Sequence, residues 1–195
     1  MRTAFVLGVL IVIAIVASVG AFHQFNSLVG NNSKDELSRY LDDNAHTAAP
    51  PKSVGFQVDF PVPPARQAEK VSVGVGSLTV ARDRALVDDE ITFDAVWFDL
   101  PGSAPADPTR LLSTLINLQI HQAGGVKQSV GKQERIDRAS SRDIVYRTVE
   151  TTGAKRYFDE RIIVQGRRVW LLRVGSHIPR YEAFRQFAAS FTFTK

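Results

Sequence analysis

An uncharged apolar run near the start of the chain places the strongest constraint on its architecture. From Ala4 to Phe22 there are 19 residues without a charged side chain, and only Gly8, Ser18 and Gly20 interrupt the larger apolar residues and alanines. As a helix rising about 1.5 Å per residue, this run would measure roughly 28 Å, close to the ~30 Å hydrocarbon core of a bilayer. We therefore predict a transmembrane helix over residues 4–22.

Charged residues on either side of this segment predict its orientation. Arg2 precedes it, whereas residues 23–43 carry two basic and four acidic side chains. Because positive charge is retained on the cytoplasmic side, residues 1–3 should stay inside and the rest should be extracytoplasmic. The alternative is a secreted protein with a cleavable signal, since Arg2 gives a basic start and residues 19–21 are small. The run exceeds the roughly 7–15 apolar residues of such signals, which favours an uncleaved single-pass anchor in the cell membrane.

The absence of cysteine narrows both location and chemistry. Disulfide frameworks, CxxC redox sites, thiolate zinc sites and cysteine nucleophiles are all excluded. An exported chain without cysteine suits a bacterial cell envelope better than a disulfide-rich secretory route. With 44% hydrophobic and 23% charged residues, the composition is that of an ordinary globular protein rather than a disordered chain.

Residues 23–53 are predicted to form a stalk and linker. Ser33-Lys34-Asp35-Glu36 has the Ser-x-x-Glu spacing of a capping box, which indicates a short helix that either rests on a neighbouring surface or stays solvated. Pro50-Pro51 prevents a helix from continuing. The folded domain should therefore occupy residues 54–195, enough for a single core.

Hydrophobic periodicity in these residues predicts an α+β fold with a mainly antiparallel sheet and two helices. Asp107-Pro108 is typical of a helix start, because the carboxylate caps free amides and proline fits the first helical position. Gly124-Gly125 should end that helix. A second amphipathic helix follows Pro179, with apolar residues every three or four positions from Tyr181 to Phe191. Strands are predicted at 56–60, 71–75, 78–82, 91–98, 129–136, 144–150, 157–164 and 168–174, the last two joined by a tight turn at 165–167.

Three of these segments together resemble the PsbP/Mog1-like domains of exported or membrane-anchored bacterial proteins of unknown function. They are the strand and proline at Gly55–Pro61, the hairpin segment Gly166–Gly175, and the closing stretch Phe187–Phe191 after Pro179. The resemblance covers roughly residues 54–194. It implies an antiparallel sheet flanked by helices, used as a binding or assembly module, and it supplies no catalytic set.

The motifs predict no catalytic, cofactor or metal site. None of the four histidines, at positions 23, 46, 121 and 177, has another at metal-binding spacing. Residues 74–76 lack the third glycine of a dinucleotide site, and no serine has the G-x-S-x-G context of a nucleophile. Asp88-Asp89-Glu90 lacks the pattern of a calcium loop and is predicted to be a solvated turn.

An uneven distribution of charge is the feature that points to a binding surface. Residues 127–185 hold fourteen basic and seven acidic side chains, whereas residues 48–126 hold six and nine. If the basic residues share a face, they should attract anionic lipid headgroups, phosphate-bearing wall polymers or an acidic protein patch. The alternative is a solvated sheet face with cross-strand pairs, such as Arg161 with a nearby acid. The predicted binding residues are Lys155, Arg156, Arg161, Arg167, Arg168 and Arg173.

These observations lead to one functional hypothesis and two alternatives. The first is a membrane-anchored, non-catalytic interaction or assembly module of the bacterial cell envelope, which binds a protein or anionic partner and neither a cofactor nor nucleic acid. A small envelope hydrolase would instead need a pocket in which acids or histidines perturb each other's pKa values. A ligand-carrying module would need an apolar cavity lined by residues such as Trp97, Phe98 and Trp170.

Overall fold

The structure is a computed structural model of the 195-residue chain, and it describes residues 46–48, 55–73, 76–100 and 107–194. The predicted membrane helix at 4–22 and the predicted capping box at 33–36 lie outside these residues. Among the residues that are described, no helix is both long and apolar enough to cross a bilayer. Strand β1 (His46–Ala48) lies inside the predicted linker and pairs with β2 (Phe56–Phe60).

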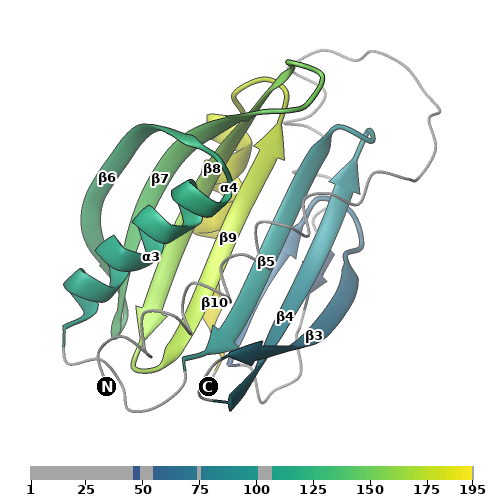
Figure 1. Ribbon diagram of the computed structural model, residues 1–195. Coiled ribbons are helices and arrows are strands. Elements are labelled where there is room, and N and C mark those ends of the chain that lie inside the picture. Colours follow the sequence, from purple (N-terminus) through teal and green to yellow (C-terminus); the bar gives the residue numbers. More distant parts are fainter. Residues whose placement is uncertain (1–45, 49–54, 74–75, 101–106, 195) are drawn as a thin grey trace.

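Seven strands form one antiparallel sheet in the order β3-β4-β5-β9-β8-β7-β6 (Figure 1). They are β3 (Ala65–Val73), β4 (Gly76–Val87), β5 (Ile91–Asp99), β6 (Val126–Ile136), β7 (Ala139–Val149), β8 (Lys155–Gln165) and β9 (Arg168–Ser176). The runs β3-β4-β5 and β6-β7-β8-β9 meet where β5 pairs with β9, and helix α3 (Pro108–Gln122) connects them. A second sheet contains β1, β2 and β10 (Thr192–Phe193).

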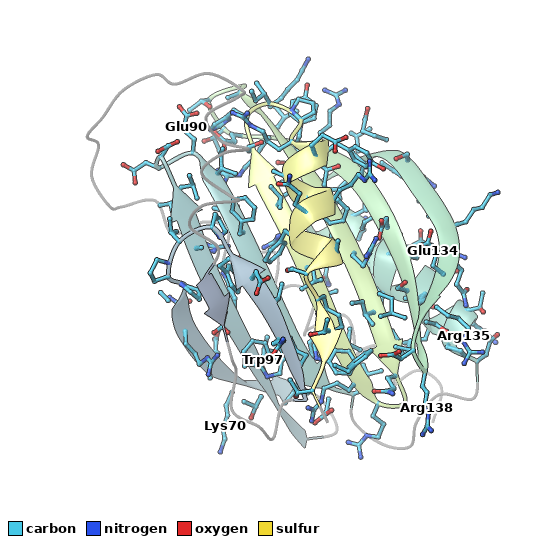
Figure 2. The ribbon with its side chains drawn as sticks, turned by 180° about the vertical axis from the view of Figure 1, so that it is seen from behind. Lys70, Glu90, Trp97, Glu134, Arg135 and Arg138 are labelled. Carbon is cyan, nitrogen blue, oxygen red and sulfur yellow. The ribbon has the colours of Figure 1, made fainter. Side chains whose placement is uncertain are left out.

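A helix lies on each face of the large sheet. Figure 1 shows α3 in front of β6, β7 and β8, and Figure 2 shows α4 (Tyr181–Ala189) on the opposite side together with the small sheet. We call these sides the α3 face and the α4 face. The predicted α+β architecture, mainly antiparallel with two flanking helices, is confirmed. Because side chains alternate along a strand, the sheet contributes to two separate cores, one under each helix.

Local chemistry explains why α3 begins and ends where it does. The Asp107 carboxylate accepts hydrogen bonds from the backbone amides of Thr109 and Arg110, at 2.9 and 3.2 Å, and Pro108 occupies the first helical position. Gly124, with φ +61°, follows the last turn. The helix buries one apolar side against the sheet, formed by Leu111, Leu112, Leu115, Ile116 and Ile120.

The core of the α4 face is built largely from aromatic rings. Phe56 lies 5.2 Å from Trp97 and 5.5 Å from Phe191, between ring centroids, and Trp170 lies 5.3 Å from Phe193. The predicted second helix is confirmed but ends at Ala189, so Phe191 lies beyond it and packs against β2. This core joins the large sheet, the small sheet and α4.

Two tight turns lie at the same end of the sheet. Gly166 and Arg167 connect β8 to β9, with Gln165 paired to Arg168, and Gly166 has φ +60°, which confirms the predicted hairpin. Asp137 and Arg138 connect β6 to β7 in the same way, with Asp137 at φ +52°. The acidic turn at residues 88–90 lies at the other end, where Glu90 is labelled in Figure 2, and it is exposed as predicted.

Candidate functional site

The structure separates the six predicted binding residues. Lys155 and Arg156 begin β8 at one end of the sheet, whereas Arg167 and Arg168 lie at the opposite end, in and after the β8–β9 turn. Arg161 and Arg173 lie between these ends but on opposite faces, because Arg161 is in register with Leu172 and Arg173 is in register with Glu160. The six residues therefore do not form one surface.

Arg161 forms the cross-strand pair that the sequence offered as an alternative. Its Nε and Nη2 donate to the two carboxylate oxygens of Asp143 at 2.7 and 2.9 Å, and the two residues face each other across β7 and β8. This hydrogen bonding raises the pKa of Arg161. Arg156 Nη1 lies 4.0 Å from a carboxylate oxygen of Glu150, the residue that follows β7. Ordinary strand pairing therefore accounts for the placement of Arg161.

Arg173 is buried on the α3 face, inside a row of alternating charges. The register places Arg84, Asp94, Arg173 and Glu160 side by side across β4, β5, β9 and β8. Asp94 is fully buried and accepts hydrogen bonds at 2.6 Å from Arg84 Nε and at 2.9 Å from Arg173 Nη2. Burial raises the pKa of Asp94, but the charges of Arg173 and Arg84 outweigh this effect and hold the pKa well below its usual range. Arg173 thus neutralises buried Asp94 and is not exposed to an external partner.

Glu160 ends this row beneath α3. Its Oε2 accepts a hydrogen bond from the Tyr146 hydroxyl at 3.3 Å and lies 3.5 Å from Gln119 Nε2, and its Oε1 has no hydrogen-bond partner among the described residues. Burial raises the pKa of Glu160 to about 7, against the lowering effects of Arg173 and of the bond from Tyr146. The side chain is fully buried, so a ligand in solvent cannot contact it. Its ionisation should instead change the stability of the fold as the pH changes.

A cleft of about 920 Å³ opens at the end of the sheet that carries the two tight turns. Figure 2 shows Arg138 at this end, opposite to Glu90. The cleft brings together the β6–β7 turn, the β8–β9 turn, the end of β5, the residue before β2 and the end of β10. Its lining residues are Gly55, Asp99, Asp137, Arg138, Gln165, Arg167, Arg168, Trp170, Phe193 and Thr194. Two of the six predicted residues, Arg167 and Arg168, therefore lie in one site.

Three guanidinium groups face two carboxylates in this cleft. Arg168 donates to both oxygens of Asp99 at 2.6 Å, and this hydrogen bonding lowers the pKa of Asp99. Arg167 Nε donates to the Leu100 carbonyl at 2.7 Å, which fixes the side chain at its base. Arg138 is exposed and forms no ion pair with any residue in the described ranges. The cleft therefore keeps positive charge available to a ligand.

Aromatic side chains give the cleft an apolar wall beside its cations. Trp170 and Phe193 both line it and pack edge to face. A group that fills such a site would combine an anion with an apolar portion, because the guanidiniums favour the first and the rings favour the second. Sequence reasoning missed Arg138 and Phe193. The pattern Ile136-Asp137-Arg138-Ala139, two polar residues between apolar ones, was the available signal for the turn that presents Arg138.

In the part of the chain that the structure describes, the two carboxyl groups with clearly raised pKa values do not lie together. Burial raises the pKa of Asp159 to about 6, and Glu160 has the other strongly raised carboxyl pKa in the described part of the chain. These residues are adjacent on β8, so their side chains lie on opposite faces of the sheet. Neither of them lines the cleft. Within the described ranges, no group of three histidine or acidic residues is arranged to hold a metal ion.

The proposed aromatic cavity is not formed. Trp97 and Trp170 pack in the core of the α4 face, whereas Phe98 packs in the core under α3. Successive residues of a strand point to opposite faces, so Trp97 and Phe98 cannot line one cavity. That part of the ligand-carrier hypothesis is wrong, and only Trp170 borders the cleft.

Comparisons with known proteins find similar structures but no family. No family model matches the chain, and no curated protein matches it. The chain is similar to the solution structure of cyanobacterial PsbP (CyanoP) from Synechocystis sp. PCC 6803, with 14% identity, a TM-score of 0.49, and coverage of 87% of this chain and 98% of that one. It is also similar to a Pseudomonas aeruginosa protein of unknown function, with 9% identity, a TM-score of 0.37, and coverage of 75% and 94%. The first of these is a PsbP protein, and the likeness concerns the fold alone.

Proposed function

We propose that this chain is a membrane-anchored, non-catalytic interaction module of the bacterial cell envelope that binds an anionic partner in the cleft. The cleft supports the proposal because Arg138, Arg167 and Arg168 come from two separate turns and converge beside Trp170 and Phe193. The uncharged run at residues 4–22 supports the membrane anchor. Binding energy in such a site comes from charge-assisted hydrogen bonds at the rim and from apolar contact with the rings.

The partner should present a carboxylate or phosphate next to an apolar group. Arg138 and Arg167 supply guanidinium donors that can hydrogen-bond to the oxygens of a planar carboxylate or a tetrahedral phosphate. The neighbouring rings of Trp170 and Phe193 favour an apolar group beside the anion. An acidic, partly apolar segment of an envelope protein meets both requirements.

A small probe tests the chemistry of the cleft. Phenyl phosphate should bind the full-length protein in non-ionic detergent more tightly than inorganic phosphate does, because only the former has an apolar group. The chain has two tryptophans, Trp97 and Trp170, so a Trp97→Phe variant reports on Trp170 alone through its fluorescence. We expect saturable quenching that Arg138→Glu with Arg167→Glu abolishes. The matched control is Arg135→Glu, since Arg135 is exposed on β6 and does not line the cleft.

Crosslinking in the native membrane tests the biological role. The wild-type chain and the Arg135→Glu control should capture the same envelope protein, and the Arg138→Glu, Arg167→Glu variant should lose it. Equal capture by all three chains would contradict a role for the cleft. Extraction of the chain from membranes by alkaline carbonate would contradict the anchor.

A further inference from the structure

Exposed apolar side chains gather at the end of the molecule opposite to the cleft. Val149, Ile178 and Tyr181 are 59%, 46% and 55% exposed, and they are half of the large apolar side chains that the described residues leave exposed. Two basic residues, Lys155 and Arg185, are exposed beside them. We call this set of five residues the α4 corner.

The contacts of these residues show that the α4 corner is continuous. Val149 is the register partner of Lys155, and the Lys155 carbonyl lies 3.2 Å from Nδ1 of His177, the residue before Ile178. Tyr181 begins α4 three residues later, and the Arg185 guanidinium lies 5.9 Å from the centre of its ring. Three apolar side chains and two cations thus lie close together where β7 and β9 end and β8 begins.

Charge around the α4 corner is positive on balance. Arg185 lies 3.7 Å from Glu182, whereas Lys155 forms no ion pair with a residue in the described ranges. The acidic residues 88–90 lie at the same end of the sheet, but in the turn between β4 and β5, on the other side of β9. The end of the molecule therefore has a basic, apolar side and a separate acidic side.

Strand β1 joins the small sheet at the end of the molecule that carries the α4 corner. β1 begins at His46, whose register partner is Phe60, and Phe60 packs 5.1 Å from Phe187 of α4. Phe60 lies at the end of β2 remote from Gly55, which lines the cleft. Within the described ranges, His46 therefore lies at the end of β2 that is remote from the cleft.

We propose that the α4 corner rests on an anionic lipid bilayer and that the cleft consequently faces away from it. Exposed tyrosine and aliphatic side chains flanked by lysine and arginine suit the boundary between headgroups and acyl chains, where ring and methyl groups insert and cations meet phosphates. The acidic turn at 88–90 tilts the domain so that α4, rather than the β4–β5 turn, approaches the lipid. This inference rests on the proposed membrane location.

The absence of cysteine makes a direct test possible. Single cysteines replace Ile178 in the α4 corner, Glu90 in the acidic turn and Arg138 in the cleft, and each carries an environment-sensitive NBD label. The full-length protein is reconstituted into phosphatidylcholine vesicles with or without about 30% phosphatidylglycerol. Lipids with a nitroxide near the headgroup should quench the label at position 178 at least about three-fold more than the labels at positions 90 and 138, and only when phosphatidylglycerol is present.

Charge variants and flotation separate the possible failures. Lys155→Glu with Arg185→Glu should reduce quenching at position 178 to that at position 138, whereas the Arg135→Glu control should leave it unchanged. Equal quenching at all three positions, in protein that floats with the vesicles, would overturn the inference and leave the proposed anchor intact. Protein that does not float with the vesicles would overturn the proposed membrane location and the inference together. A Tyr181→Cys label provides a second position in the corner should the change at Ile178 prevent folding.

Discussion

The two faces of the large sheet are stabilised by different interactions. On the α4 face, Phe56, Trp97, Trp170 and Phe191 fill the space between the sheet, α4 and β2 with ring contacts. On the α3 face, apolar packing under α3 gives way to the row Arg84, Asp94, Arg173 and Glu160. The α4 face therefore depends mainly on aromatic and apolar packing, whereas the α3 face combines an apolar core with a row of charges that compensate each other.

This difference determines how each face responds to a change. Apolar packing loses stability in proportion to the volume removed and is indifferent to pH. A buried charge left without its partner costs far more than the pair contributed, and its protonation couples stability to pH. Arg82 shows the strain on the α3 face, because it is almost fully buried and burial lowers its pKa to about 10. The stability of the α3 face should therefore depend on each buried charge keeping its partner.

The largest effect is expected from Asp94→Ala. This change leaves Arg84 and Arg173 without the carboxylate that they share, so the free energy of unfolding should fall by about 3–5 kcal/mol. Urea denaturation of the full-length protein measures the loss. A triple variant, Arg84→Met, Asp94→Leu and Arg173→Met, removes Asp94 together with both of its arginine partners and should recover most of that stability. A loss below about 1 kcal/mol in Asp94→Ala would mean that water reaches the row and replaces the carboxylate.

A pH-dependent effect is expected from Glu160→Gln. Because the pKa of Glu160 rises from 4.5 to about 7 on folding, the folded state keeps a proton that the unfolded state has already lost between these values. Stability contributed through this group is thus complete below about pH 4.5 and is lost as the pH rises to about 7. The difference amounts to about 3 kcal/mol.

Denaturation curves at pH 5 and pH 8 check this expectation. The wild-type protein should be less stable at pH 8 than at pH 5, and Glu160→Gln should remove much of that difference and be the more stable protein at pH 8. Asp159→Asn is the control for the opposite face, because the pKa of Asp159 also rises on burial, to about 6, and it should remove a separate part of the pH dependence. An unchanged pH profile in Glu160→Gln would show that Glu160 is ionised in the folded protein.

The smallest effect is expected from Arg161→Gln. Asp143, its partner, keeps more than a third of its side chain exposed, so water can replace the lost hydrogen bonds. The free energy of unfolding should fall by less than about 1 kcal/mol, with little dependence on pH. Thermal unfolding measures the change, and Asp143→Asn should give a similar value. A loss of several kcal/mol would place this pair with the buried row rather than with the surface.

Local chemistry made much of the fold predictable. The Asp107-Pro108 start of α3, the Gly166 turn and the alternation at Phe56–Phe60 each depend on residues that lie close together in the chain, and each is confirmed. Residues 65–70 of β3 were not predicted as a strand. They are exposed alanines and polar residues without a hydrophobic alternation, and only pairing with β4 makes them extended.

The candidate site was only partly predictable. The excess of basic residues after position 126 is visible in the sequence, and Arg167 and Arg168 do line the cleft. Arg138 and Phe193 join them from segments on either side in the chain, and no local pattern places those segments together. Sequence reasoning likewise grouped Arg161 with Arg173, although strand alternation puts them on opposite faces.

The sequence by itself determined the elements of this protein: an uncharged run long enough to span a bilayer, two capped or proline-led helices, and strands separated by turn residues. These depend on interactions within a few residues, which composition and spacing record directly. Tertiary structure alone decided which charges are partners and which remain available. Strand register sets Arg173 beside Asp94 in the interior and leaves Arg138 at a turn in the cleft, because pairing across a sheet joins residues that are far apart in the chain.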